Sequence, residues 1–586
     1  MLPTSCSVAY ETAVAQQQQQ RQHQASRVQQ LPGQPRQRCT KEPAAEDEQQ
    51  PALSAPAAAR QHAPPLVLLP KQLWGRIMDP LNTEIFSIAL PMLATLAADP
   101  IAGLVDTAYV GRLGANQLAG VGVALSVFNT TTKLLNVPLL SVTTSSVAAA
   151  AGRAAAEAKS AAAAANHGTT GGSTSSASLA AAAGLSSAIS SSTLIAGVAG
   201  LVQALLLVGG GAWAAQLWGI SASSPLWAPA SDFLSIRALG APVTVLLLVM
   251  QGVYRGLQDT RTPFYATIAA NALNVVLGWA FIFGLGLGVK GAALATVTAQ
   301  LLPLSWLFIR LARRYGVTFT DSSTLKSVGK LFAPTGYLVL RTAAITFTYA
   351  IATGLTARAG PAAAACHQVC FQLWLASSLM ADSLAVACQT MLAKSLAARD
   401  TSTAQRVVQR CVSMASLLGC LLALLLWLGQ RAIPAAFTAD AAVLALVGST
   451  LPFVVATQPV NALAFVWDGV LFGAGGFRYA SVQMALCAVP AVVLMNLGPH
   501  ALAGAAPAIK LQYVWLGLSL VMCCRALSIW APYKLRLPPF PGPAGSGSTS
   551  KAAVAWLRSW PNPAACTPVG QHAQYRHGQC GCEHAQ

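Results

Sequence analysis

Apolar segments long enough to cross a lipid bilayer recur along most of this chain, and they limit the folds it can adopt. A transmembrane helix needs about 20 mainly apolar residues, and runs of that length follow one another from about residue 82 onward. Only 9% of the residues are charged, against about 25% in soluble proteins. We therefore expect an all-α integral membrane protein and exclude a soluble enzyme.

The segments predict twelve transmembrane helices, so both termini lie on one side of the membrane. We expect these helices at residues 82–110, 117–149, 192–218, 231–256, 263–285, 290–312, 331–356, 361–393, 408–430, 443–474, 478–499 and 509–531. Most basic residues fall in the connections that follow an even-numbered helix, among them Arg255. By the positive-inside rule, these connections and both termini face the cytoplasm or its plastid equivalent.

An internal repeat divides the helices into two lobes. Five residues of the first half recur 217 positions later, and an earlier set recurs 246 positions later. The first set is Pro242, Gly252, Val253, Gly256 and Arg261, which recur as Pro459, Gly469, Val470, Gly473 and Arg478. We expect six-helix lobes at 81–312 and 331–535, an inter-lobe loop at 313–330, and a central cleft suited to alternating access.

Three segments are expected to lack packed structure. The Ala/Ser/Gly-rich stretch 150–192 falls where the repeat offset drops by 29, and it reads as a flexible insertion. Residues 1–80 and 536–586 are low-complexity and predicted to be disordered. The first forty residues hold four arginines and one acid, Glu11, which suits a transit peptide as well as a plain low-complexity tail. We expect the plastid envelope, with the plasma or vacuolar membrane as alternatives.

The net charge of +18 does not indicate nucleic-acid binding. The basic residues are spread over short loops and the tails without a stripe of interleaved aromatics, so membrane topology accounts for them. The thirteen cysteines lie mostly in apolar helices, where cysteine packs as a small hydrophobe. The Cys/His-containing tail fits no standard zinc spacing. We therefore expect no metal, no cofactor and no nucleic-acid partner.

Two aspartates, Asp99 and Asp106, lie inside the first apolar segment. Seven residues on an α-helix turn about 700°, which puts both carboxylates on one face about 10 Å apart. A carboxylate at the bilayer centre costs about 2.5–3.5 kcal/mol on insertion scales, and such residues usually line an ion or substrate pathway.

Six stretches carry a resemblance to a known family. They are DPIAGLVDTAYVGRLGANQLAGVG, KLLNVPLLSVTTS, YRGLQDTRTP, GVKGAALAT, CHQVCFQLWLASSLMADSLAVACQ and FVWDGVLFGAGGFRYA. With these stretches in order and in both halves, the chain resembles multidrug and toxic compound extrusion (MATE) transporters. The resemblance covers about residues 80–535. The chain is most similar to the branch of bacterial DNA-damage-inducible (DinF-type) and plant DETOXIFICATION-like members. The resemblance implies twelve helices in two lobes and efflux driven by H⁺ or Na⁺.

The resemblance also implies roles in the first lobe. Asp106 matches the family's cation-coupling aspartate, and Pro91 matches its helix-kink proline, which frees the helix to bend. Asn274 matches a polar position, but Gly278 stands where many members carry a second aspartate. Coupling then rests on Asp106 with Asn274 or involves the second lobe. Alternatively, Asp106 caps the helix or pairs with Arg112, and Asp99, before Pro100, is a local structural acid.

The second lobe has a polar set of its own, Arg341, His367, Asp382 and Asp468. Arg341 is the only arginine that we place deep within an apolar helix. It either forms a structural salt bridge with Asp382 or Asp468, or meets an anionic substrate, because its planar fork suits carboxylates. His367 is a packed bundle residue or a proton carrier.

The sequence thus predicts a monomeric antiporter without enzymatic activity, which exports a small organic compound in exchange for H⁺ or Na⁺. An exporter of organic anions, of citrate or phenolic type, is the alternative within transport. A lipid flippase or a membrane-embedded transferase is the alternative of another class. The transferase would need an Asp-rich diphosphate motif, HExxH, or paired acids and His on one loop, and the chain has none. The flippase would need a large cationic cleft.

Overall fold

The computed structural model describes residues 79–166, 172–217, 221–319, 322–500 and 507–535. Every element in this part of the chain is helical. The helices are α3 (Pro80–Gly111), α4 (Ala115–Asn166), α5 (Gly172–Leu217), α6 (Trp227–Leu239), α7 (Ala241–Gly256), α8 (Arg261–Trp279), the π-helix η1 (Ala280–Gly284), α9 (Gly288–Tyr315), α10 (Ser322–Arg358), α11 (Pro361–Ala397), α12 (Thr401–Leu428), α13 (Ala432–Ala435), α14 (Ala441–Gly473), α15 (Phe477–His500) and α16 (Pro507–Leu535). The predicted N-terminal extension and C-terminal tail lie outside the described residues.

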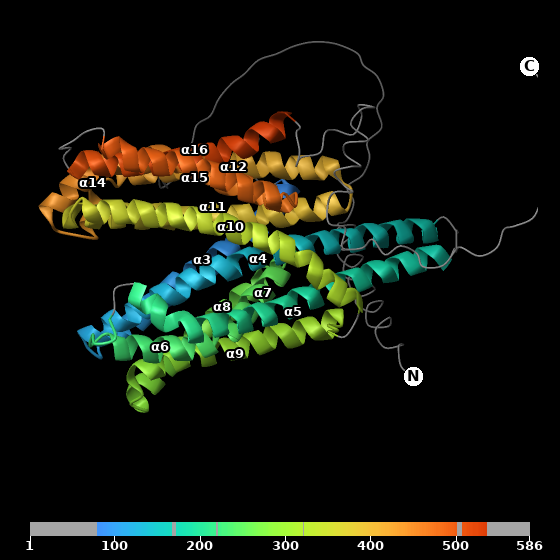
Figure 1. Ribbon diagram of the computed structural model, residues 1–586. Coiled ribbons are helices and arrows are strands. Elements are labelled where there is room, and N and C mark those ends of the chain that lie inside the picture. The colour runs from blue at the N-terminus through green and yellow to red at the C-terminus, as the bar shows by residue number, and fades with distance from the viewer. Residues whose placement is uncertain (1–78, 167–171, 218–220, 320–321, 501–506, 536–586) are drawn as a thin grey trace, which may run out of the picture. The chain divides into compact units, whose positions relative to one another are not determined.

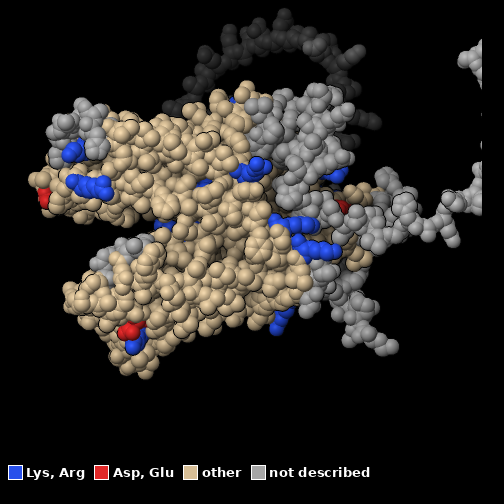
Figure 2. Space-filling model, viewed as in Figure 1, with Lys and Arg blue, Asp and Glu red and all other residues tan. Residues whose placement is uncertain are grey.

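The prediction of twelve spans is confirmed. Eleven described helices are long and apolar enough to cross a membrane, and the pair α6–α7, bent by 53°, makes the twelfth. Figure 1 shows α11, α12 and α14–α16 side by side in one group and α5–α9 in another. On the face in Figure 2 the helix sides are almost free of charge, and Lys and Arg gather near helix ends. This is the distribution expected for helices surrounded by lipid.

One predicted helix, 231–256, is in fact broken. The break is at Gly240, whose missing side chain leaves room for Val297 of α9 in direct contact. Pro242 then stands within the first two residues of α7, where its fixed φ and missing N–H are tolerated. The bend therefore follows from a close helix contact next to a proline.

The expectation of a flexible insertion at 150–192 is wrong for most of its length. α4 continues to Asn166 and α5 begins at Gly172, so the two helices extend together beyond the rest of the bundle (Figure 1). Alanine has the highest helix propensity, so this composition favours continued helices. The base of the extension is packed, because Ser186 donates to the Gly316 carbonyl at 2.6 Å and the Ser187 and Ser327 hydroxyls lie 3.2 Å apart.

The predicted inter-lobe loop is also shorter than 313–330. α9 runs to Tyr315 and α10 begins at Ser322. The lysines of this stretch, Lys326 and Lys330, therefore lie on α10.

The repeated glycines have the same role in both lobes. A Cβ at Gly256 of α7 would lie 2.8 Å from the Thr144 carbonyl of α4, and one at Gly473 of α14 would lie 2.9 Å from the Gln389 carbonyl of α11. Only glycine allows these helix backbones to approach so closely. The sequence repeat thus corresponds to one small-residue helix contact, used once in each lobe.

The two lobes are joined by hydrogen bonds between α4 and the second lobe. The amide of Gln389 on α11 donates to the Ser141 carbonyl at 2.9 Å and to the Ser145 hydroxyl at 2.8 Å. Ser145 in turn donates to the Phe472 carbonyl of α14 at 3.0 Å. One serine of the first lobe therefore contacts two helices of the second.

Further inter-lobe contacts lie beside the basic connections. Lys394 at the end of α11 donates to the Gln258 side chain, and Gly152 of α4 leaves room for the Lys394 carbonyl. Arg410 of α12 forms an ion pair of 2.8 Å with Asp79, the N-cap of α3. The lobes therefore touch on the side that carries the basic connections. Elsewhere the surface is hollowed between the two helix groups (Figure 2).

Candidate functional site

Two acid–amide pairs join α3 to α8 in the first lobe. The Asn274 amide donates to the Asp106 carboxylate at 2.8 Å, and the Asn271 amide donates to Asp99 at 3.4 Å. Asp106 is half-buried, whereas Asp99 is exposed. The two aspartates share one face of α3, and the two asparagines share one face of α8. Because these two faces pack together, each aspartate meets one asparagine. The structure therefore brings two of the residues predicted for cation coupling, Asp106 and Asn274, into direct contact, whereas Asp99 pairs with Asn271 instead.

Gly278, which the family resemblance sets against an aspartate of many members, faces the ring of Tyr109. A Cβ at Gly278 would lie 3.3 and 3.4 Å from two ring carbons of Tyr109. That ring makes an edge contact with Phe283 of the π-helix η1, with centroids 6.0 Å apart. A carboxylate at position 278 would therefore have to displace an aromatic ring that is itself packed.

Arg237 of α6 is a charged residue near Asp106 that the sequence analysis missed. Its side chain is buried, with 7% exposure, and its guanidinium lies 4.2 Å from the centre of the Phe128 ring. Nε and Nη1 have no hydrogen-bond partner among the described residues. Asp106 is the carboxylate with which Arg237 interacts electrostatically. An arginine inside the predicted span 231–256 was the signal that could have revealed it.

In the second lobe, two arginines share one carboxylate. Arg341 of α10 and Arg525 of α16 both donate to Asp468 of α14. The prediction that Arg341 pairs with a nearby acid is thus resolved in favour of Asp468. The expectation that Arg341 is the only deep arginine is wrong, because Arg525 within the predicted helix 509–531 is even more buried, with a side chain 5% exposed against 12% for Arg341. Within this contact group two cations therefore share one anion, and Asp382, another buried acid of the lobe, interacts with both arginines at longer range.

The two guanidiniums also lie over aromatic rings. Arg341 is 5.0 Å from the centre of the Phe472 ring, and Arg525 is 4.7 Å from that of Phe465. Cation–π contacts stabilise a desolvated cation. They explain how a membrane-spanning lobe holds two arginines with a single acid.

Asp382 of α11 does not join this ion-pair group by direct contact in the described part of the chain. Its main electrostatic partner is Arg255, which the sequence analysis placed in a loop. Arg255 in fact lies on α7, is buried, and donates to the Gln251 side chain at 3.5 Å. The Arg255–Asp382 interaction therefore links a helix of the first lobe to one of the second.

His367 lies apart from these charges. It is buried, its Nε2 is 3.3 Å from the Thr353 hydroxyl, and its ring lies 5.7 Å from those of Phe371 and Trp515. It does not contact Asp468 or the arginines among the described interactions. Packing with aromatic neighbours is thus its observed environment.

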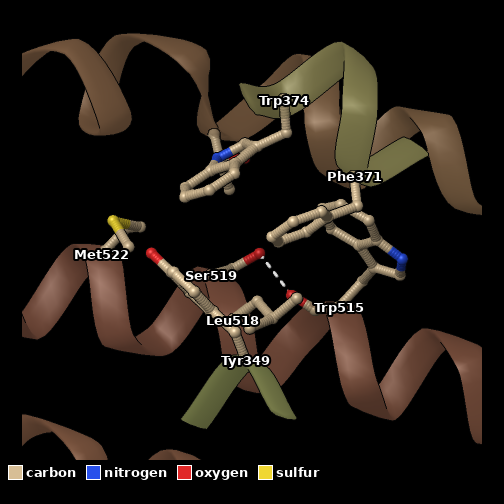
Figure 3. A pocket seen from close by; sticks show the side chains of 8 residues that line it. Tyr349, Phe371, Trp374, Trp515, Leu518, Ser519 and Met522 are labelled. Atoms are coloured by element: carbon tan, nitrogen blue, oxygen red, sulfur yellow. Dashed lines mark hydrogen bonds between the residues drawn. The ribbon is translucent and has the colours of Figure 1, made fainter. Parts of the chain in front are cut away.

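An aromatic pocket lies between α10, α11 and α16 (Figure 3). The rings of Tyr349, Phe371 and Trp374 are in mutual contact, with centroids 5.6–5.7 Å apart. In Figure 3 the Tyr349 hydroxyl points toward Met522, and Ser519 donates to the Trp515 carbonyl. The cavity measures about 10 Å³, about the room one water needs. In this conformation it is closed to an organic molecule.

Pro91, the predicted kink residue, lies inside α3, which runs through Pro91 and Pro100 without a break. The Thr95 hydroxyl donates to the Pro91 carbonyl at 2.8 Å. Each proline removes one backbone hydrogen bond from α3.

Comparison with known sequences identifies relatives that match most of the chain. The MatE family model matches residues 172–280 and 338–497. Protein DETOXIFICATION 43 of Arabidopsis thaliana is 36% identical over 484 residues, covering 77% of this chain and 90% of its own length. Protein DETOXIFICATION 44, chloroplastic, from the same plant is 35% identical over 448 residues, covering 76% and 81%. DNA damage-inducible protein F of Escherichia coli is 27% identical over 472 residues, covering 77% and 92%.

Solved structures share the fold at lower identity. The crystal structure of MATE in complex with MaL6 has a TM-score of 0.65 at 17% identity and covers 79% of this chain and 97% of its own. The Vibrio cholerae MATE transporter VcmN in the bent form has a TM-score of 0.65 at 19% identity, covering 78% and 96%. With the twelve spans in two repeated lobes, these matches show that the chain belongs to the MATE family of multi-pass membrane transporters.

Proposed function

We propose that this transporter exports a small organic compound in exchange for protons that bind Asp106. The observation that carries the proposal is the Asp106–Asn274 pair at 2.8 Å inside the first lobe. An ionisable group retained in a membrane span at an energetic cost marks an ion or substrate pathway. Protonation would turn a charged acceptor of the Asn274 hydrogen bond into a neutral group, which changes how α3 and α8 interact.

The surroundings of Asp106 favour H⁺ over Na⁺. A hard metal cation is bound by several oxygen ligands, and the hydrogen bond to Asp106 comes from the amide nitrogen of Asn274. The charged neighbour of Asp106 is the buried Arg237, which supplies no oxygen ligand for a metal cation. With Gly278 in the place of a second acid, the site offers a single carboxylate, which can bind one proton but supplies few oxygen ligands for a metal cation.

Pro91 is proposed as the hinge of this response. It removes a backbone hydrogen bond about four turns before Asp106, so α3 can bend there when the Asp106 interactions change. Alternating access then consists of opening the inter-lobe contacts around Ser145 and Gln389 and closing the other side.

The test is ion-driven flux in proteoliposomes that contain the full-length chain. A pH gradient should drive export of a cationic dye, and a Na⁺ gradient alone should not. Asp106→Asn should reduce pH-driven export to background while the protein still elutes as one species. Asp232→Asn is the matched control, since Asp232 pairs with Lys290 at an exposed site. Export driven by Na⁺ alone, or near-normal export by Asp106→Asn, would rule out the proposal.

Export of organic anions is a second candidate, because Arg341 and Arg525 share a single acid. The guanidinium of Arg525 lies beside the aromatic pocket, since it donates to the sulfur of Met522 at 3.6 Å and Met522 lines the pocket. A substrate carboxylate would supply the missing counter-charge. Citrate competing with dye export in wild-type proteoliposomes would support this substrate class.

The plastid envelope is the proposed membrane. Two relatives carry the designation chloroplastic in their names, Protein DETOXIFICATION 44 and Protein DETOXIFICATION 45 of Arabidopsis thaliana. The first forty residues have the arginine excess of a transit peptide. A fluorescent fusion of residues 1–80 should enter plastids, and a fusion that stays in the cytosol would contradict the assignment.

A further inference from the structure

The C-terminal end of α9 carries an open groove with three arginines. Its volume is about 440 Å³. Its lining residues are Trp306, Ile309, Arg310, Arg313 and Arg314. None of these arginines forms an ion pair with a carboxylate in the described part of the chain. The groove therefore presents uncompensated positive charge beside apolar side chains.

The groove continues an exposed apolar stripe along α9. Leu302, Trp306, Ile309 and Arg313 are spaced by four, three and four residues, which places them on one face of the helix. The first three are 63%, 43% and 48% exposed, although α9 is long and apolar enough to span a membrane. An exposed apolar stripe on such a helix faces lipid chains. Arg313 ends the stripe where the chain leaves the span.

The charged end of this stripe lies at membrane-surface level. α9 ends at Tyr315 on the side of the basic connections, and it lies at the edge of its helix group in Figure 1. Tryptophan is enriched at this depth, where its ring meets both lipid chains and headgroups. The Arg310 guanidinium lies 5.9 Å from the centre of the Trp306 ring, so this exposed arginine lies beside the apolar side chains of the groove.

We propose that this groove binds an anionic membrane lipid. The guanidiniums of Arg310, Arg313 and Arg314 would donate to the headgroup phosphate, a geometry that arginine forks favour. One acyl chain would lie along Leu302, Trp306 and Ile309. Basic residues near the surface of an anionic leaflet each add to lipid affinity. This site is separate from the export pathway and does not depend on which substrate or ion is transported.

The proposal is tested by lipid binding to the purified full-length chain. Native mass spectrometry and thermal unfolding would compare added phosphatidylglycerol with added phosphatidylcholine. Wild type should retain phosphatidylglycerol and unfold at a higher temperature with it than with phosphatidylcholine. The triple variant Arg310→Gln/Arg313→Gln/Arg314→Gln should bind phosphatidylglycerol at least about tenfold more weakly, since each surface arginine contributes a factor of about five.

A charge-matched control separates a site from general attraction. Arg399→Gln/Arg406→Gln/Arg478→Gln removes three exposed arginines from the second lobe on the same side, away from the groove. It should keep wild-type affinity for phosphatidylglycerol. Equal losses in both triple variants would reduce the effect to net charge and overturn the proposal. If free inorganic phosphate raised the unfolding temperature of wild type as much as phosphatidylglycerol does, that result would also overturn the proposal, because the apolar stripe would then have no role in binding. If the triple variant fails to fold, Arg313→Gln with Trp306→Ala provides the same comparison.

Discussion

The Asn274 amide of α8 donates a hydrogen bond of 2.8 Å to the Asp106 carboxylate of α3. A second amide–acid pair, Asn271 and Asp99, lies beside it at 3.4 Å, where the acid is exposed. The shorter bond and the half-buried carboxylate distinguish Asp106 from Asp99. This difference allows the two acids, which look alike in the sequence, to be assigned different roles.

Replacing Asn274 should impair coupling more than replacing Asn271. A hydrogen bond to a charged group contributes about 1.5–3 kcal/mol, so Asn274→Ala should slow pH-driven export by about tenfold or more. Asn271→Ala removes a longer bond to an exposed acid and should slow it by less than about threefold. Initial rates in proteoliposomes give the comparison. Equal effects of the two variants would remove the distinction between Asp106 and Asp99.

Arg237 is predicted to be a positioning residue for Asp106. Arg237→Gln should lower pH-driven export at least about tenfold and shift its pH profile, because Asp106 loses its neighbouring cation. Arg237→Lys keeps the charge and should retain most of the activity and the wild-type profile. A purely structural role would give equal melting temperatures and equal activity losses for both variants, with no change in the pH profile.

The two arginines that contact Asp468 should influence which substrates are transported, which a purely structural salt bridge would not. Arg341→Gln leaves the Arg525–Asp468 pair in place but removes the second guanidinium that contacts Asp468. It should therefore reduce citrate transport at least about tenfold while dye export changes by less than about threefold. The measurement is paired flux of both substrates in one preparation. Equal loss for the two classes assigns Arg341 to stability and ends the anion hypothesis.

Two glycines, one at the close approach of α4 to α11 and one at an open position of α5, should respond differently to replacement by alanine. Gly152→Ala places a methyl group against the Lys394 carbonyl, so it should force the lobes apart on the basic side and slow transport several-fold. Gly184→Ala meets open space in α5 and should stabilise the helix by up to about 1 kcal/mol without affecting transport. Flux and melting temperature of both variants test the contact. Wild-type flux in Gly152→Ala would show that this contact is not part of the transport cycle.

Deletions in the α4–α5 extension should separate its outer part from its packed base. Removing residues 156–183 leaves the serines at 186, 187 and 190 in place and should leave transport nearly unchanged. A deletion that includes Ser186 and Ser190 removes their hydrogen bonds to Gly316 and Thr318 and should lower the melting temperature by several degrees. Loss of folding in the shorter deletion would show that the outer extension also packs.

The sequence by itself determined the membrane class, the number of spans and the two lobes. These follow from local hydropathy and from repeat spacing, which need no knowledge of helix packing. The expectation from sequence failed at 150–192. The small polar residues there indicated a flexible linker, although the high alanine content of the segment favours helix. The expectation also failed at Gly240, where a contact with Val297, 57 positions away in the chain, decides the break.

Only the tertiary structure decided the ion pairs and the contacts between lobes. Arg341 and Arg525 lie 127 and 57 positions from Asp468, and hydropathy along the chain cannot show which of several buried charges face one another. In lipid a buried charge must find a partner within the bundle or a ligand, and that partner depends on how the helices rotate and cross. The same packing places the Tyr109 ring opposite Gly278 and Arg237 near Asp106, so the electrostatics of Asp106, the proposed coupling residue, are a property of the assembled lobe.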